Sequence, residues 1–287
     1  MRSTFLIYGT TLAYIMLLNQ AYASGFSDIL QEIVNNRSPI IVKSTHDPLP
    51  KNIAGQDSIS TASQQALLRA ITAYADVSEK QGVVLLTQEK AAALYQHIEA
   101  AEKHSISGRI TRADLDLAKA RLTQAQADLR DAQAALKAAH LAYRHETGRE
   151  AAEVEHMPPL PVALPKSEQE VLALAAHHPA LLPGTQHTDT RHQIEENALQ
   201  EWRDFNAASK SISTYAQSIA MAEKELRCVE SEHTEGTRSV LELLSAQEEV
   251  YSLKIAMLRA KTHYVVRSYR ILVATGALST AVIPANA

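Results

Sequence analysis

The chain has 287 residues, enough for one large domain or two small ones. A formal net charge of −4 argues against a nucleic-acid-binding protein, because such proteins usually present a basic face. With only 9 glycines, 5% aromatic residues and long runs rich in Ala, Leu, Glu, Gln, Lys and Arg, the composition predicts an all-α fold. The single cysteine, Cys228, excludes an internal disulfide and a cysteine-based metal site.

Residues 1–23 have the pattern of an export signal. Arg2 supplies a positive start, an apolar stretch runs from Phe5 to Leu18, and Ala21-Tyr22-Ala23 has the small residues that signal peptidase reads. We therefore predict cleavage after Ala23 and an exported mature chain that begins at Ser24. The alternative is an uncleaved anchor, although a membrane span needs about 20 apolar residues. No later segment has 18 consecutive apolar residues, so no transmembrane helix is expected.

The chain contains an internal repeat with a constant offset. Gly108 corresponds to Gly236 and Gly148 to Gly276, and a threonine precedes the second glycine of each copy. The same offset matches further pairs: Leu115 with Leu243, Ala118 with Ala246, Leu122 with Val250, Leu129 with Met257, and Tyr74 with Trp202. The register predicts two repeats, 24–156 and 166–280, joined by a proline-rich linker at 157–165 and followed by a tail at 281–287.

Each repeat also contains a seven-residue apolar period. In the first copy it is formed by Leu115, Leu122, Leu129, Leu136 and Tyr143, with a parallel series of Ala118, Ala125, Ala132 and Ala139. In the second copy it is formed by Leu243, Val250, Met257, Tyr264 and Ile271. A sustained heptad period is typical of coiled-coil helices, and alanine allows a neighbouring helix to approach closely.

The short links around Gly108 and Gly236 predict antiparallel helical hairpins. We expect helices at about 63–104 and 111–146 in the first repeat, and at about 191–233 and 239–275 in the second. Thr111 with Asp114, and Ser239 with Glu242, have the spacing of helix-capping pairs. Two thin hairpins cannot bury their apolar seams alone, so they are expected to pack on each other and on other chains.

Three stretches of the chain resemble a known family. The segment Gly236-Thr237-Arg238-Ser239-Val240-Leu241-Glu242-Leu243-Leu244-Ser245-Ala246-Gln247 is similar to the turn and last long helix of TolC-like outer membrane channel proteins. The segment Tyr269-Arg270-Ile271-Leu272-Val273-Ala274-Thr275-Gly276-Ala277-Leu278 resembles the end of that helix. The stretch from Gly108 to Gly148 resembles the equivalent helix of the first repeat. The resemblance covers about 62–148 and 165–280.

This resemblance implies a homotrimer whose hairpins form a hollow periplasmic tunnel, working with a periplasmic adaptor and an inner-membrane pump in efflux or type I secretion. Carried onto matching positions, Gly108 and Gly236 become the hairpin tips that meet the adaptor. Glu242 would contribute to an acidic ring at the entrance, and Arg238 and Asp114 would form a gate link between hairpins. The alternative is that these three are ordinary solvated charges in first helical turns.

The chain departs from the family pattern between the helices of each repeat. A membrane strand needs about 9–11 alternating residues, and only Ile40-Ile41-Val42 suggests one. The sequence therefore predicts little or no β structure, and a member that keeps the hairpins and lacks most of the barrel strands. The alternative function is a non-channel periplasmic coiled-coil interaction protein derived from the family. Association with the outer membrane is expected for the channel component and not for this alternative. Within the tip sequences, Ser245 stands where the family often has a second acid.

The sequence gives no sign of enzyme chemistry. It has no glycine-rich phosphate loop, no nucleophile elbow and no dinucleotide-binding fingerprint, and no cofactor is expected. Histidines gather near one loop, where a metal carrier is a third hypothesis, but solvated histidines are the more common arrangement. These histidines are His177, His178, His187 and His192.

Overall fold

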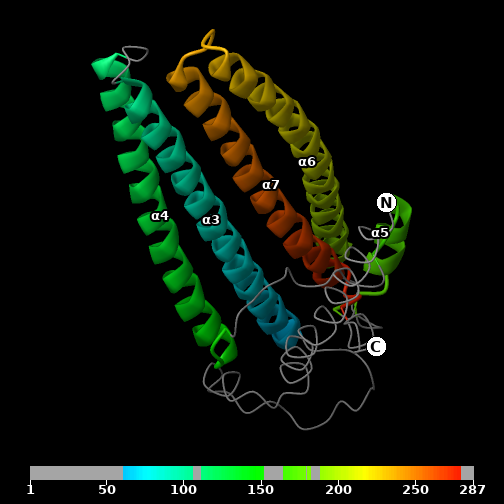
Figure 1. Ribbon diagram of the computed structural model, residues 1–287. Coiled ribbons are helices and arrows are strands. Elements are labelled where there is room, and N and C mark those ends of the chain that lie inside the picture. The colour runs from blue at the N-terminus through cyan, green and yellow to red at the C-terminus, as the bar shows by residue number, and fades with distance from the viewer. Residues whose placement is uncertain (1–60, 106–110, 152–163, 179, 182–187, 279–287) are drawn as a thin grey trace, which may run out of the picture.

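The computed structural model describes residues 61–105, 111–151, 164–178, 180–181 and 188–278. These ranges form α3 (Thr61–Ser105), α4 (Arg112–Thr147), α5 (Glu168–Ala175), α6 (Thr188–Thr234) and α7 (Val240–Ala274), and they contain no strand. The long helices lie side by side in one layer in the order α4, α3, α7, α6, with the ends of α3 and α6 and the starts of α4 and α7 at the same end (Figure 1). The predicted all-α fold of long antiparallel hairpins is confirmed.

The helices begin and end close to the expected positions. The expected segments 63–104, 111–146, 191–233 and 239–275 correspond to α3, α4, α6 and α7. The short helix α5 was not expected from the sequence. The signal segment 1–23, most of the linker at 157–165 and the tail at 281–287 lie outside the described residues. None of the described helices has an apolar stretch long enough to cross a membrane.

The ends of the two repeats have the same local structure. Gly148 and Gly276 have φ angles of 71° and 69°. The threonine before each glycine is buried, and its Oγ1 donates a hydrogen bond of 2.8 Å to the carbonyl four residues earlier. These carbonyls belong to Tyr143 and Ile271, which are themselves equivalent positions of the repeat. The correspondence found in the sequence therefore extends to the geometry of the helix ends.

The alanine series of α4 forms the contact with α3. Ala118 and Ala125 are almost fully buried, and Ala132 and Ala139 are also buried. The leucine series beside it is only half-buried in Leu115, Leu122, Leu129 and Leu136. Small side chains allow the two helices to approach closely, as the sequence predicted, whereas the leucines retain apolar surface on the edge of the layer.

The second repeat buries its heptad series more fully because α7 has a neighbour on each side. Leu243, Val250 and Ile271 are buried between α3 and α6. On α3, Gly82 faces Leu258 of α7 so closely that a Cβ at position 82 would lie 2.5 Å from the leucine Cδ2. The absence of a side chain at Gly82 thus lets Leu258 pack directly on the α3 backbone.

Aromatic contacts strengthen the end of the layer opposite the turns. Tyr74 packs edge-on against Tyr143 with ring centroids 6.0 Å apart, and Trp202 stacks on Phe205 at 5.9 Å. Burial beside Tyr143 raises the pKa of Tyr74 to about 12. The repeat-matched positions Tyr74 and Trp202 therefore both serve in packing. The helix α5 docks on this second aromatic group through Val171 and Ala175, which are fully buried.

Candidate functional site

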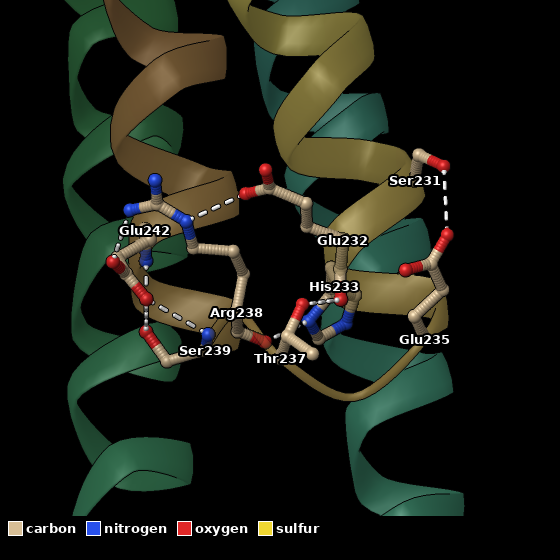
Figure 2. Close-up of polar contacts among 8 residues, drawn as sticks. All are labelled: Ser231, Glu232, His233, Glu235, Thr237, Arg238, Ser239 and Glu242. Atoms are coloured by element: carbon tan, nitrogen blue, oxygen red, sulfur yellow. Dashed lines mark hydrogen bonds and ion pairs between the residues drawn. The ribbon is translucent and has the colours of Figure 1, made fainter.

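The turn between α6 and α7 is built by hydrogen bonds to the last turn of α6. Thr237 N–H donates to the carbonyl of Glu232 at 2.9 Å, and Gly236 N–H donates to the carbonyl of His233 at 3.0 Å. This pair of bonds is the Schellman arrangement, which needs a left-handed residue, and Gly236 has φ +83°. The imidazole Nδ1 of His233 adds a bond of 2.9 Å to the carbonyl of Arg238. The turn is therefore a defined structure rather than a loose loop (Figure 2).

The start of α7 is capped by a reciprocal pair. The backbone N–H of Glu242 donates to Ser239 Oγ at 3.2 Å, and the backbone N–H of Ser239 donates to Glu242 Oε2 at 2.9 Å. The Ser239 hydroxyl also donates to the same carboxylate at 2.9 Å. Both bonds of the predicted capping box are present, and they satisfy two backbone donors that the helix itself leaves unpaired.

Arg238 joins the two helices of the turn through two carboxylates. Its Nε lies 2.7 Å from Glu232 Oε2 on α6, and its Nη1 lies 2.7 Å from Glu242 Oε1 on α7 (Figure 2). These contacts raise the pKa of Arg238, with the hydrogen bond to Glu242 as the largest cause. Arg238 thereby fixes the end of α6 relative to the start of α7.

The Glu242 carboxylate is strongly stabilised in its charged form. The backbone N–H of Ser239 is the largest cause and Arg238 follows, and together with the Ser239 hydroxyl they lower the pKa of Glu242 from 4.5 to about 2. Glu242 is therefore ionised across the physiological pH range in this arrangement.

A shallow groove lies between α6 and α7 next to this turn. It is lined by Glu225 on α6, by Glu242 and Glu249 on α7, and by Arg238, with Ala222 and Ala246 among the small side chains. Three carboxylates and one guanidinium give the groove a net charge of −2. Such a groove can accept a narrow cationic segment, because the alanines leave room and the carboxylates attract positive charge.

The two residues expected to form a gate link have different partners within the chain. Arg238 bonds Glu232 and Glu242 in its own turn, while the Asp114 carboxylate accepts a 2.7 Å bond from the hydroxyl of Thr111, which is the N-cap of α4. Among the described residues, no hydrogen bond or ion pair joins Arg238 to Asp114, so the gate link between them stays a prediction. Gly108, the other expected tip, lies outside the described residues.

A different polar contact joins the two hairpins within the chain. The Arg121 Nη1 of α4 donates to Ser245 Oγ of α7 at 2.9 Å and lies 3.5 Å from the carbonyl of Leu241. On α3, Lys90 Nζ lies 2.9 Å from Glu248 of α7 and 3.6 Å from Asp128 of α4. Sequence reasoning missed both contacts, because each depends on how the helices of one repeat cross those of the other.

The histidines near α5 do not converge in the described part of the chain. Nδ1 of His177 bonds the carbonyl of Ala173 at 2.8 Å, and Nδ1 of His178 accepts from the N–H of Ala180 at 3.1 Å. His192 lies 3.9 Å from Glu195, and His187 falls outside the described residues. No group of three metal-binding side chains occurs in the described ranges.

Comparison with known proteins places these helices in a wider context. No family model matches the chain. The outer membrane efflux protein BepC of Brucella suis is 24% identical over 79% of this chain, and the alignment covers 66% of BepC, slightly less than two thirds of its length.

Solved outer membrane channels share the fold. The channel OprN superposes with a TM-score of 0.61 and 13% identity, covering 75% of this chain and 68% of OprN. CusC superposes with a TM-score of 0.62 and 13% identity, covering 90% of this chain and 73% of CusC. The similarity spans both hairpins rather than one repeat alone, because it covers three quarters or more of the chain. The chain is therefore similar in sequence to an outer membrane efflux protein and shares its fold with solved outer membrane channels.

Proposed function

We propose that the chain is the outer-membrane-factor component of a tripartite efflux or type I secretion system. In this role three copies form an exit tunnel that works with a periplasmic adaptor and an inner-membrane pump. The chain is exported and acts as a conduit in the periplasm and outer membrane, not as an enzyme. The observation that carries the proposal is the relationship to an efflux protein over 79% of the chain, which includes both hairpins of the layer.

The edge of the layer supports association with further copies. Leu117 and Leu141 on α4 are 49% and 58% exposed, and by helical periodicity both lie on the side of α4 away from the buried alanines that contact α3. Apolar side chains along one helix edge are suited to pack against another helix. A neighbouring copy would bury these leucines and continue the layer around a central tunnel.

The turn between α6 and α7 is the proposed point of contact with the adaptor. Gly236 forms its tip, and the adjoining groove carries a net charge of −2 from three carboxylates and Arg238. We expect the adaptor segment that binds there to be narrow and to carry basic side chains. Gly108 would form the equivalent tip of the first hairpin.

The entrance of the tunnel is the proposed place of the acidic ring and the gate. Three copies of Glu242 would face one another there and favour cations. The proposed gate link between Arg238 and Asp114 would require Arg238 to leave Glu232 or Glu242. Each of those contacts measures 2.7 Å within one chain.

Fractionation and conductance test the proposal together. The mature chain, expressed from its gene with the export segment intact, should be recovered in the outer-membrane fraction and should require detergent for extraction. The purified protein should then produce stepwise conductance in a planar lipid bilayer. Recovery in the detergent-free periplasmic extract, with no conductance, would contradict the proposal and favour a non-channel interaction protein.

A further inference from the structure

We propose that Arg121 sets the position of the start of α7 along α4 at the tip of the molecule. It does so by holding the first turns of α7 against α4. The bond lies within one chain and requires no assembly. Its consequence for the tunnel rests on the proposed function, because the segment it holds begins at the turn that carries Arg238 and Glu242.

The geometry of the contact is specific to an arginine facing a serine. Arg121 Nη1 donates to Ser245 Oγ at 2.9 Å, and the Ser245 hydroxyl donates in turn to the carbonyl of Leu241 at 2.8 Å. The hydroxyl proton is thus engaged along α7, which leaves the oxygen lone pairs to accept from the guanidinium. The same guanidinium nitrogen lies 3.5 Å from the Leu241 carbonyl, so Arg121 contacts two successive acceptors on α7.

Apolar packing next to this bond brings the helices together without fixing their alignment. Val240 and Leu244 of α7 are buried in a cluster with Leu94 and Ile98 of α3 and with Ala118 of α4. Contacts of this kind are non-directional, and the buried side chains that α4 contributes to this cluster are alanines, which interlock little with α7. A charge-assisted hydrogen bond has a fixed length and direction, and it therefore sets the position of α7 along α4.

The other charged contacts near the tip cannot replace Arg121. Lys90 of α3 lies 2.9 Å from Glu248 of α7 and 3.6 Å from Asp128 of α4, so it links these two helices only through a side chain of α3. Arg238 joins α7 to α6 within the second hairpin. The hydrogen bonds from Arg121 connect α4 directly to α7. Removing them should let the second hairpin shift away from α4 at the tip.

Distances between spin labels on the full-length mature protein test this proposal. The natural Cys228 is exposed on α6 near the turn, and Ala113 is exposed in the first turn of α4. An Ala113→Cys variant therefore carries one label on each hairpin. The labelled protein is diluted with unlabelled Cys228→Ser chain, so that the pulsed electron paramagnetic resonance signal comes from distances within one chain.

The variants separate the bond from the general effect of losing a charge. Arg121→Met and Ser245→Ala should each broaden the distance distribution and move it to longer values. The double variant should show no larger change than Arg121→Met alone, because both substitutions remove the same bond. The control Arg130→Met changes an exposed arginine nine positions further along α4 and should leave the distribution unchanged.

Two results would overturn the proposal: an unchanged distribution in Ser245→Ala, or fully additive effects in the double variant. Circular dichroism establishes whether each variant is folded. If Arg121→Met loses helix, the result for Ser245→Ala, which deletes one oxygen atom, decides the question. Bilayer conductance is recorded separately. A protein that does not conduct can still show the distance changes expected for the Arg121–Ser245 bond, so the proposal for Arg121 and the proposed channel function can fail independently.

Discussion

At the turn between α6 and α7, a single carboxylate has several bonding partners. Glu242 accepts bonds from the backbone and hydroxyl of Ser239 and pairs with Arg238. These contacts lie within one chain, so the carboxylate stabilises the turn whether or not a tunnel forms. Any gate in which Glu242 or Arg238 changes partner must first break contacts that organise the turn.

The first prediction concerns the titration of Glu242. Its folded pKa of about 2 lies below its ordinary value of 4.5, so the carboxylate stabilises the turn above pH 4.5. That contribution should decline as the pH falls below 4.5 and be lost as the pH passes through about 2. Arg238→Met should raise the pKa of Glu242 while leaving it below 4.5, because the contacts with Ser239 remain.

Carbonyl-detected nuclear magnetic resonance of the Glu242 side chain measures this pKa directly. Arg227→Met, which changes an exposed arginine on α6, is the matched control and should leave the titration unchanged. An identical Glu242 pKa in the parent protein and in Arg238→Met would show that the ion pair does not act on this carboxylate.

The sequence predicted the capping pair of this turn but not the side-chain contacts of Arg238 and Arg121. The capping box follows from Ser239 and Glu242, because serine and glutamate at that spacing satisfy the first backbone donors of a helix. The partner Glu232 precedes the turn, and only the left-handed conformation at Gly236 brings it back to Arg238. Arg121 and Ser245 belong to different repeats, and no local pattern signals their contact.

At the scale of the helices, the small and the large apolar side chains of α4 have different environments. The buried alanines Ala118 and Ala125 face α3, while the half-buried leucines lie beside them. The heptad period in the sequence identified both series and predicted a close helix approach at the alanines, but it did not tell how much of the leucine series would be covered. The covered area depends on how α3, α4 and α7 pack together, which is a property of the assembled layer.

The second prediction tests the close approach of α3 and α4. Ala118→Leu should lower the free energy of unfolding by about 1–3 kcal/mol, because a larger side chain in a fully packed contact forces the helices apart. Urea denaturation followed by circular dichroism measures the change. Ala134→Leu, at an exposed position of the same helix, should alter the stability little. Equal effects at both positions would contradict a tight alanine contact.

The short helix α5 has a capping signal in the sequence, although the helix itself was not predicted. Ser167 caps its start, with Glu170 N–H donating to Ser167 Oγ at 3.2 Å and Lys166 N–H donating to the Glu170 carboxylate at 2.6 Å. The serine–glutamate spacing is the same signal that identified the start of α7. The helix has only eight residues, and its stability depends on Val171 and Ala175 docking against α6 and α7.

At the scale of the whole molecule, the layer has a well-packed centre and apolar edges. The inner helices α3 and α7 contact neighbours on both sides, whereas α4 retains exposed Leu117 and Leu141. The repeat and the glycine turns allowed the architecture to be predicted from sequence. The number of copies depends on the angle at which two edges meet, and this angle is not encoded in any short pattern of residues.

The third prediction concerns assembly. Light scattering of the purified mature protein should give about three times the mass of one chain. Leu117→Glu and Leu141→Glu should each lower the trimer fraction without loss of helix, because a charge would be buried at the edge. Leu85→Glu, at a 61% exposed position of the inner helix α3, is the control and should leave the trimer intact. A monomeric parent protein would remove the basis for the proposed tunnel.

The order α4, α3, α7, α6 gives the layer two unlike flanks (Figure 1). Association of unlike flanks is heterologous, and a constant rotation between successive copies closes such a series into a ring. A subunit that has lost one flank but kept the other can join the series and cannot extend it. Such a subunit acts as a terminator, and even a minor fraction of it in a mixed population prevents many rings from closing.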